Sequence, residues 1–247
     1  MKRILFPTLA VLISFTLSGS AQMAPPSAPV PAALAKCFGN VTAFSAKCEV
    51  RVLDRNDKEK FSAPAEFALL DGKFRMELDF TQVKGQGIQQ EQAAMMKQMG
   101  MDKLVSITRP DRKMTTVVYP GMQACLNSPM TKEQTDAVDE SAKVEKTEQG
   151  KETVDGHPCV KNKVVVTDSK GQTSEAFVWN ATDMKDFPVQ VQVKEKNNTV
   201  IMLYKDVKLA KPAADKFEVP AAYTTYNNMQ EFSAGMMQKM MGAAAKQ

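Results

Sequence analysis

Residues 61–80 read FSAPAEFALLDGKFRMELDF, with Asp71-Gly72 near the middle. Apolar residues recur at every second position on both sides of Asp71-Gly72, which is the period of a strand with one buried face. Asp-Gly between two such runs is typical of a two-residue hairpin turn. The stretch therefore predicts an antiparallel hairpin whose core-facing positions are Phe61, Ala63, Ala65, Phe67, Leu69, Phe74, Met76, Leu78 and Phe80.

The same alternation continues on both sides of this hairpin. Upstream, FSAKCEVRV at residues 44–52 places apolar and polar side chains on opposite faces. Downstream, we expect a helix near 89–100, one or two helical turns within 131–141, and strands near 104–109, 112–119, 122–127, 142–149, 158–167, 173–180, 187–196 and 199–209. About eleven strands without βαβ alternation predict a mainly β protein. Its single antiparallel sheet is too long to stay flat, so it should curl into an open half-barrel.

The N-terminus has the organisation of a secretory signal peptide. Lys2 and Arg3 precede an apolar run at 4–17, and small residues follow at 18–21. The run is shorter than the about 20 apolar residues that span a membrane, and Ser20 stands where a bacterial lipoprotein signal would need Cys. We therefore expect residues 1–21 to be removed, and the mature chain to be periplasmic or secreted, without a lipid anchor and without a membrane span.

Composition divides the rest of the chain into three segments. Four prolines among Ala and Ser predict an extended linker at 22–33. We expect the folded domain at 34–226 and a Met-rich amphipathic helix at 227–247. Loss of Lys2 and Arg3 with the signal peptide lowers the formal net charge from +4 to +2, and there is no long basic run. Both points argue against a nucleic-acid partner.

Four cysteines follow the signal peptide, and an even number in an oxidising compartment suggests disulfides. Four cysteines allow three connectivities. Their spacing favours a bond between Cys37 and Cys48 and a second between Cys125 and Cys159. The chain has one histidine and no Cys-x-x-Cys pair, so a zinc site is not expected.

Catalytic motifs are not evident in the sequence. The single histidine, His157, lies in the turn DGHP at 155–158, and no Gly-x-Ser-x-Gly or His-Glu-x-x-His motif accompanies it. Glu77 and Asp79 have the residue types of a glycosidase pair, but they fall on the polar face of a strand. We therefore interpret them as surface charge and predict that the protein is not an enzyme.

Five segments carry a resemblance to a known family: FSAKCEVRVLD at 44–54, FALLDGKFRMELDF at 67–80, RKMTTVVYPGMQAC at 112–125, GKETVDGHPCVKNKVVV at 150–166 and DKFEVPAAY at 215–223. Together they resemble an exported bacterial family of domains of unknown function. That family is similar to the periplasmic lipoprotein carriers of the LolA and LolB superfamily, which also includes an envelope-stress regulator. The resemblance implies a curved sheet of about eleven strands and a concave face that holds a hydrophobic cavity lidded by helices.

Methionine accounts for 17 of the 247 residues and is concentrated near 95–101 and 229–241. On a helix, methionines three or four positions apart share one face. One interpretation is that these faces only complete the core, where the unbranched thioether fills irregular gaps.

A functional interpretation is that the methionines form a pliable lid. Their side chains could repack around a lipid or acyl chain of variable shape, because flexible Met-rich surfaces suit promiscuous binding. The concave face beneath the lid would be apolar. The residues expected to contact the ligand are Phe61, Phe67, Phe74, Phe80, Met95, Met96 and Met99.

Two other functions compete with the lid. Thioethers are soft ligands that select Cu(I), and Met96 with Met99 and Met237 with Met240 have a Met-x-x-Met spacing. An exposed sheet edge could instead bind an envelope protein, as in a sensor module. We favour an exported, non-catalytic protein that binds a hydrophobic ligand and needs no cofactor.

Overall fold

A computed structural model describes residues 37–38, 41–85, 90–132, 135, 143–167, 171, 173–194 and 198–244. The predicted signal peptide and linker lie outside these residues, as does most of the 131–141 stretch. The bounds of the predicted domains therefore stay a prediction.

The described chain is mainly β. Its strands are β1 (Ala43–Leu53), β2 (Glu59–Leu70), β3 (Lys73–Asp79), β4 (Lys84–Gly85), β5 (Lys103–Arg109), β6 (Met114–Tyr119), β7 (Ala124–Pro129), β8 (Lys143–Val154), β9 (His157–Thr167), β10 (Thr173–Ala181), β11 (Phe187–Lys194), β12 (Thr199–Lys208) and β13 (Thr224–Tyr226). The helices are α2 (Gln90–Gln98) and α4 (Met229–Ala244), with 3₁₀ turns η1 (Phe80–Gln82), η2 (Pro110–Arg112), η3 (Pro120–Met122) and η4 (Ala214–Phe217).

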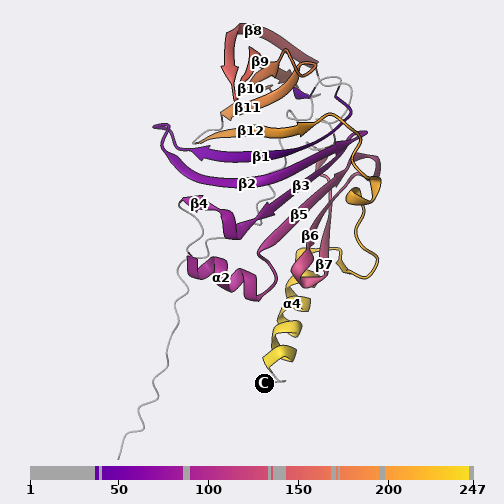
Figure 1. Ribbon diagram of the computed structural model, residues 1–247. Coiled ribbons are helices and arrows are strands. Elements are labelled where there is room, and N and C mark those ends of the chain that lie inside the picture. The colour runs from indigo at the N-terminus through magenta and orange to yellow at the C-terminus, as the bar shows by residue number, and fades with distance from the viewer. Residues whose placement is uncertain are drawn as a thin grey trace, which may run out of the picture.

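All of these strands belong to one sheet (Figure 1). Its order is β13-β7-β6-β5-β3-β2-β1-β12-β11-β10-β9-β8, with β4 paired to β2 beside this path. Neighbours are antiparallel except β13, which runs parallel to β7. The prediction of one open, curved antiparallel sheet is therefore confirmed, although it has 13 strands rather than about eleven.

The predicted hairpin at 61–80 is also confirmed. Asp71 and Gly72 both have positive φ angles, 49° and 81°, as a two-residue hairpin turn requires. Asp155 and Gly156 repeat this geometry between β8 and β9, with φ angles of 50° and 84°. The first of these turns sets the register in which β2 and β3 pair. Leu69 lies opposite Phe74 and Phe67 opposite Met76, so the apolar side chains of both strands lie on the same side of the sheet.

The sheet is curled strongly enough for distant strands to share one core. Phe74 on β3 and Val164 on β9 belong to the same buried cluster, although five strands separate β3 from β9 in the sheet. Bulges contribute to the bending: the register shifts between Ser45 and Lys47 on β1 and between Trp179 and Asn180 on β10.

Buried residues form three clusters, two on the concave face and one on the convex face. The aromatic cluster, at the β1–β3 and β9–β12 end of the concave face, includes Phe38, Phe44, Phe67, Phe74, Phe187 and Tyr204. The cover cluster, beneath the two α-helices, consists of Phe80, Leu104, Val117, Tyr119, Leu126 and Phe232. The outer cluster, on the convex face, consists of Ala68, Leu70, Val105, Ile107, Val118, Cys125 and Phe217.

The segment 209–223, which we call the strap, crosses the convex face from β12 to β13. Phe217 is 1% exposed and holds the strap on the outer cluster. Next to it, the Glu218 carboxylate accepts a hydrogen bond from the guanidinium of Arg109, which also pairs with Asp111 at 2.7 Å. This hydrogen bonding lowers the pKa of Asp111 to about 2, so its carboxylate stays charged at neutral pH.

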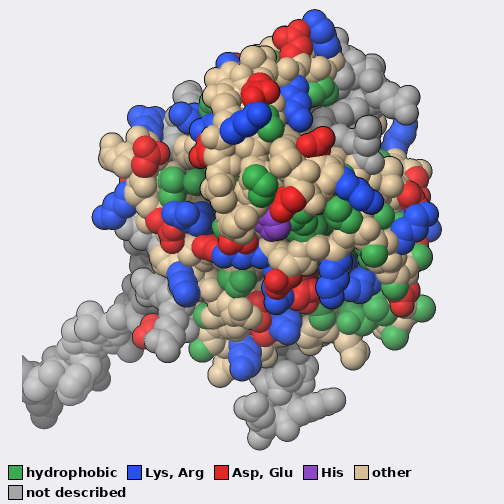
Figure 2. Space-filling view, turned by 45° about the horizontal axis from the view of Figure 1, so that its top comes forward, with side chains coloured by type: hydrophobic (Ala, Val, Ile, Leu, Met, Phe, Trp, Pro, Cys, Tyr) green, Lys and Arg blue, Asp and Glu red, His purple; other side chains and the backbone are tan. Residues whose placement is uncertain are grey.

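Away from the strap, the convex face is charged and mixed in sign. Cross-strand ion pairs join Lys47 to Asp206 and Lys205 to Glu49. Figure 2 shows basic and acidic side chains interspersed over the face that it displays. None of the helices among the described residues has the length and apolar character needed to cross a bilayer.

The predicted disulfides are wrong for this structure, in which all four cysteines are buried thiols. Cys125 lies on β7 and Cys159 on β9, and eight strands separate β7 from β9 in the sheet order. A disulfide needs Cα atoms within about 7 Å of each other. Cys37 and Cys48 share the aromatic cluster, but no disulfide joins them.

Candidate functional site

The concave face brings together three of the four predicted phenylalanines. Phe67 and Phe74 are buried in the aromatic cluster, and Phe61 packs against it while half-buried. Phe80 belongs to the cover cluster instead. The difference arises because Phe80 begins the η1 turn after β3 and so leaves the line of alternating strand positions.

A residue from outside the sheet occupies the centre of the aromatic cluster. Phe38 stacks on Phe44 with ring centroids 4.9 Å apart, and its ring also lies 5.7–6.1 Å from the rings of Phe74, Phe187 and Tyr204. The Val41 N–H donates to the Phe38 carbonyl at 3.0 Å, which ties Phe38 to the residues just before β1. Aromatic side chains therefore fill the place where the family resemblance implied a cavity.

The three methionines predicted to form a lid, Met95, Met96 and Met99, differ in their burial. Met96 packs against the cover cluster, whereas Met95 is 56% exposed and Met99 is half-buried. Within residues 91–98 of α2, no side chain is fully buried. Helix α2 therefore rests on the sheet through little more than Met96.

The residues that follow α2 are tied to neighbouring turns by close backbone contacts. Gly100, with a φ angle of 69°, approaches Gly121 so closely that a Cβ on either residue would lie 2.7 Å from backbone atoms of the other. Phe80 N–H also donates to the Asp102 carbonyl at 2.8 Å. These contacts hold residues 100–102, which follow α2, against the η3 and η1 turns.

Helix α4 forms the second part of the cover. Phe232 stacks on Tyr119 at 5.1 Å and meets Tyr226 edge-on at 5.5 Å. Gly235 permits this approach, since a Cβ there would lie 2.3 Å from the Tyr226 hydroxyl oxygen. Beyond this contact, α4 projects past the end of the sheet (Figure 1), and Met237 is 66% exposed.

The start of α4 is set by its own sequence. Asn228 caps the helix, because its side-chain oxygen accepts from Glu231 N–H at 2.8 Å. The Glu231 carboxylate accepts in return from Asn227 N–H at 3.0 Å. This reciprocal cap orients Phe232 toward the cover cluster.

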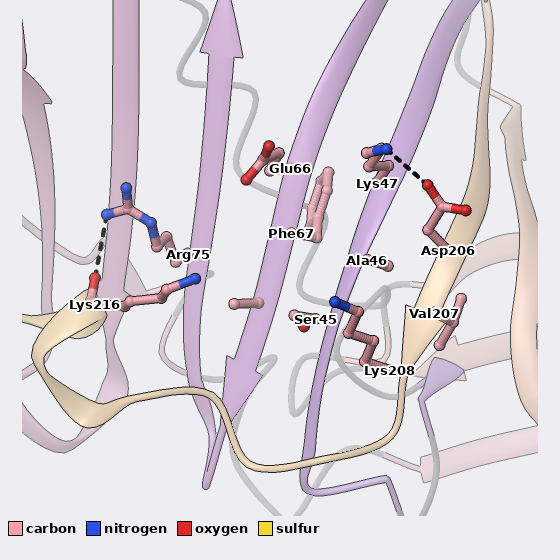
Figure 3. A pocket seen from close by; sticks show the side chains of 11 residues that line it. Ser45, Ala46, Lys47, Glu66, Phe67, Arg75, Asp206, Val207, Lys208 and Lys216 are labelled. Atoms are coloured by element: carbon pink, nitrogen blue, oxygen red, sulfur yellow. Dashed lines mark hydrogen bonds and ion pairs between the residues drawn. The ribbon is translucent and has the colours of Figure 1, made fainter.

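A cavity among the described residues lies on the opposite, convex face. It has a volume of about 590 Å³ and lies between β12, β1, β2, β3 and the strap. Figure 3 shows its charged side chains, which come from both the sheet and η4. Sequence reasoning missed this cavity, because the strap that walls it has no periodic pattern.

A β-bulge shapes one side of this cavity. Ser45 pairs with Lys208 but Lys47 pairs with Lys205, so one extra residue is accommodated on β12. Asp206 takes a φ angle of 50° there, which is uncommon for a residue with a side chain. Its hydrogen bond with Lys47, 2.8 Å long, lowers the pKa of the Asp206 carboxyl and keeps it ionised.

The only histidine of the chain helps to join two segments of the structure. His157 Nδ1 lies 2.8 Å from the Asp183 carboxylate, and the nearby Thr182 hydroxyl donates to the Pro158 carbonyl at 3.1 Å. These bonds join the start of β9 to the 182–186 turn. Among the described residues, no group of three or more His, Cys, Asp or Glu side chains could hold a metal ion.

No protein-family model matches the sequence, and no curated protein matches it. Solved structures do match. The Mycobacterium tuberculosis lipoprotein LppX is 13% identical, with a TM-score of 0.38 over 75% of this chain and 93% of that one. A LolA superfamily protein from Nitrosomonas europaea is 7% identical, with a TM-score of 0.34 over 76% and 96%. LprF from Mycobacterium bovis is 11% identical, with a TM-score of 0.38 over 78% and 95%. The likeness concerns the fold.

Proposed function

We propose that the concave face binds a hydrophobic ligand, such as a lipid or acyl chain, and that the protein is an exported binding protein without catalytic activity. The observation that carries the proposal is the position of Phe38. This ring comes from outside the sheet, yet it occupies the centre of the aromatic cluster and lies near rings from four different strands. An acyl chain that displaced Phe38 would find the same apolar surroundings.

The thin cover over the other end of the face supports the proposal. A ligand that entered beneath α2 would have to break the contact of the partly buried Met96 with the cover cluster, and no side chain among residues 91–98 is fully buried. Met96 and Met236 both pack against that cluster, and their flexible thioethers can adapt to a ligand of variable shape. We expect Phe61, Phe67 and Phe74 to contact the bound ligand.

Replacing Phe38 with alanine tests the proposal. The substitution removes the ring with which a ligand must compete, so palmitate or a lysophospholipid should raise the melting temperature of Phe38→Ala more than that of the wild type. A bound ligand stabilises by mass action, about 2.7 kcal/mol at a hundred times its dissociation constant. Differential scanning fluorimetry with and without each lipid measures the shift.

The matched control is Phe217→Ala, which removes an equally buried ring from the convex face. It should lower the melting temperature without altering the lipid-induced shift. The proposal would be wrong if neither lipid shifted the wild type or Phe38→Ala. It would also be wrong if Phe217→Ala and Phe38→Ala responded alike.

Replacing Met95, Met96 and Met99 together with leucine separates a lipid lid from a Cu(I) site. Leucine and methionine exchange in packed sites at under about 1.5 kcal/mol, so the fold and the lipid-induced shift should persist. A Cu(I) site would lose its soft ligands. Titration with Cu(I) beside the lipid measurements distinguishes the two, and a copper-induced shift abolished by the triple variant would contradict a lipid function.

A further inference from the structure

The cavity on the convex face is lined by more positive than negative side chains. Its four cationic residues face two carboxylates, a net charge of +2 at neutral pH; the six are Lys47, Arg75, Lys208, Lys216, Glu66 and Asp206. One cation and one carboxylate already neutralise each other, because Lys47 pairs with Asp206 at 2.8 Å. Arg75 is also paired, with the Glu77 carboxylate at 2.7 Å. Among these six residues, the charges without an ion pair are therefore the ammonium groups of Lys208 and Lys216 and the carboxylate of Glu66.

Two of the amines converge on the floor of the cavity. Figure 3 shows the Lys208 and Lys216 side chains extending from opposite sides toward Ser45. Within the part of the chain that the structure describes, neither amine forms an ion pair with a carboxylate. Ser45 and Ala68 are cross-strand partners on β1 and β2 that also line the cavity, and their side chains are small.

The backbones that carry these two lysines are held in place. Lys208 follows the β12 bulge, at which Asp206 adopts its positive φ angle. Lys216 belongs to η4, and its carbonyl accepts a hydrogen bond of 3.1 Å from the Arg75 guanidinium. Arg75 is itself oriented by Glu77 at 2.7 Å. An anion would thus meet two lysines whose backbones are already fixed on opposite sides of the cavity.

We infer that this cavity binds the phosphate group of a small phosphorylated molecule or of a phospholipid headgroup. A phosphate monoester carries a charge of about −1.5 to −2 at pH 7 and three acceptor oxygens, which suit the two amines that have no ion pair. The Ser45 hydroxyl supplies a further donor. A volume of about 590 Å³ exceeds that of phosphate alone and leaves space for the organic group attached to it.

Isothermal titration calorimetry with sn-glycerol 3-phosphate at low salt tests the inference. The wild type should bind it, and should not bind glycerol. The double variant Lys208→Gln/Lys216→Gln should bind at least tenfold more weakly, because it loses both charged donors. Added sodium chloride should also weaken binding, since the site is open to solvent.

The matched control is Lys211→Gln, which removes an exposed charge from the same strap but not from the cavity lining. It should bind sn-glycerol 3-phosphate as the wild type does. Thermal melting of each variant checks that the fold is kept. The inference is overturned if the wild type does not bind, or if Lys211→Gln and the double variant lose the same affinity.

Two sources of the phosphate are distinguished by a second arm with vesicles. Phosphatidylcholine vesicles with and without phosphatidic acid offer the same monoester on a lipid surface. A lipid headgroup is assigned if the wild type binds phosphatidic acid vesicles, the double variant does not, and sn-glycerol 3-phosphate binds weakly. A free metabolite is assigned if sn-glycerol 3-phosphate binds well and the vesicles bind weakly. Binding of vesicles that the double variant retains would overturn the lipid source.

Discussion

Replacing Phe44 with alanine should lower the free energy of unfolding by about 3–5 kcal/mol, the range found when a buried phenylalanine is removed from a packed core. The ring is 0% exposed and lies 4.9 Å from Phe38 and 5.0 Å from Phe187. Its loss leaves a cavity in the middle of the aromatic cluster. The surrounding rings cannot move in to fill it, because they are held on several different strands. Urea unfolding followed by circular dichroism measures the change.

The control for this prediction is Phe61→Ala. Phe61 is on the same face of the neighbouring strand but is only half-buried at the margin of the cluster. Its removal should cost clearly less, since less apolar surface leaves a packed environment. Equal costs for the two substitutions would mean that the aromatic cluster is not the centre of the core.

The second large effect is a loss of stability in alkaline solution. Burial raises the pKa of the Cys37 thiol from 9.0 to about 12, and burial also raises the pKa of the Tyr204 phenol. In the unfolded chain these groups release protons at lower pH than in the folded protein. The unfolded state therefore binds fewer protons above pH 9, and the free energy of unfolding falls as the pH rises.

The sign and size of this effect can be measured on Cys37 alone. Its contribution is fully present below pH 9 and is lost as the pH approaches 12, at about 1.4 kcal/mol per pH unit and about 4 kcal/mol in all. In Cys37→Ala, the free energy of unfolding should therefore fall less steeply with rising pH, by up to about 1.4 kcal/mol per pH unit. Urea unfolding at intervals between pH 8 and 11 supplies the data.

The control is Val41→Ala, which removes an apolar side chain packed against the same cluster without removing a titrating group. It should lower stability by a similar amount at every pH and leave the alkaline slope unchanged. If Cys37→Ala and the wild type had the same slope, the Cys37 thiol would not be buried as the structure places it.

Much of the sheet could be predicted from the sequence, because a strand with one buried face repeats every two residues. The alternation around Asp71-Gly72 is long enough to define both strands and the faces of Phe61, Phe67 and Phe74. Strands β4 and β13 were missed, since two or three residues cannot display a period. The connections of the sheet were also beyond the sequence, and this is why the pairing of Cys125 with Cys159 was wrong.

The candidate sites were less predictable than the fold. Phe38 belongs to a turn rather than to an alternating strand, so no pattern indicated that its ring would occupy the concave face. The sequence indicated that methionines share helix faces near 95–101 and 229–241, but spacing alone could not tell that Met96 is packed and Met95 exposed. The convex cavity depends on the strap and on the β12 bulge, neither of which has a local sequence signal.

The seam between β1 and β12 has a consequence for how the chain folds. Strands β1–β7 and strands β8–β12 pair almost entirely with sequence neighbours, so each half can form through local hairpins. Across the seam, by contrast, Glu49 meets Lys205 from 156 residues away. Such a high-contact-order step carries a large loop-closure entropy and folds slowly. Each half would therefore expose an unpaired strand edge until the other arrives, which makes the joining of the halves the stage most vulnerable to aggregation.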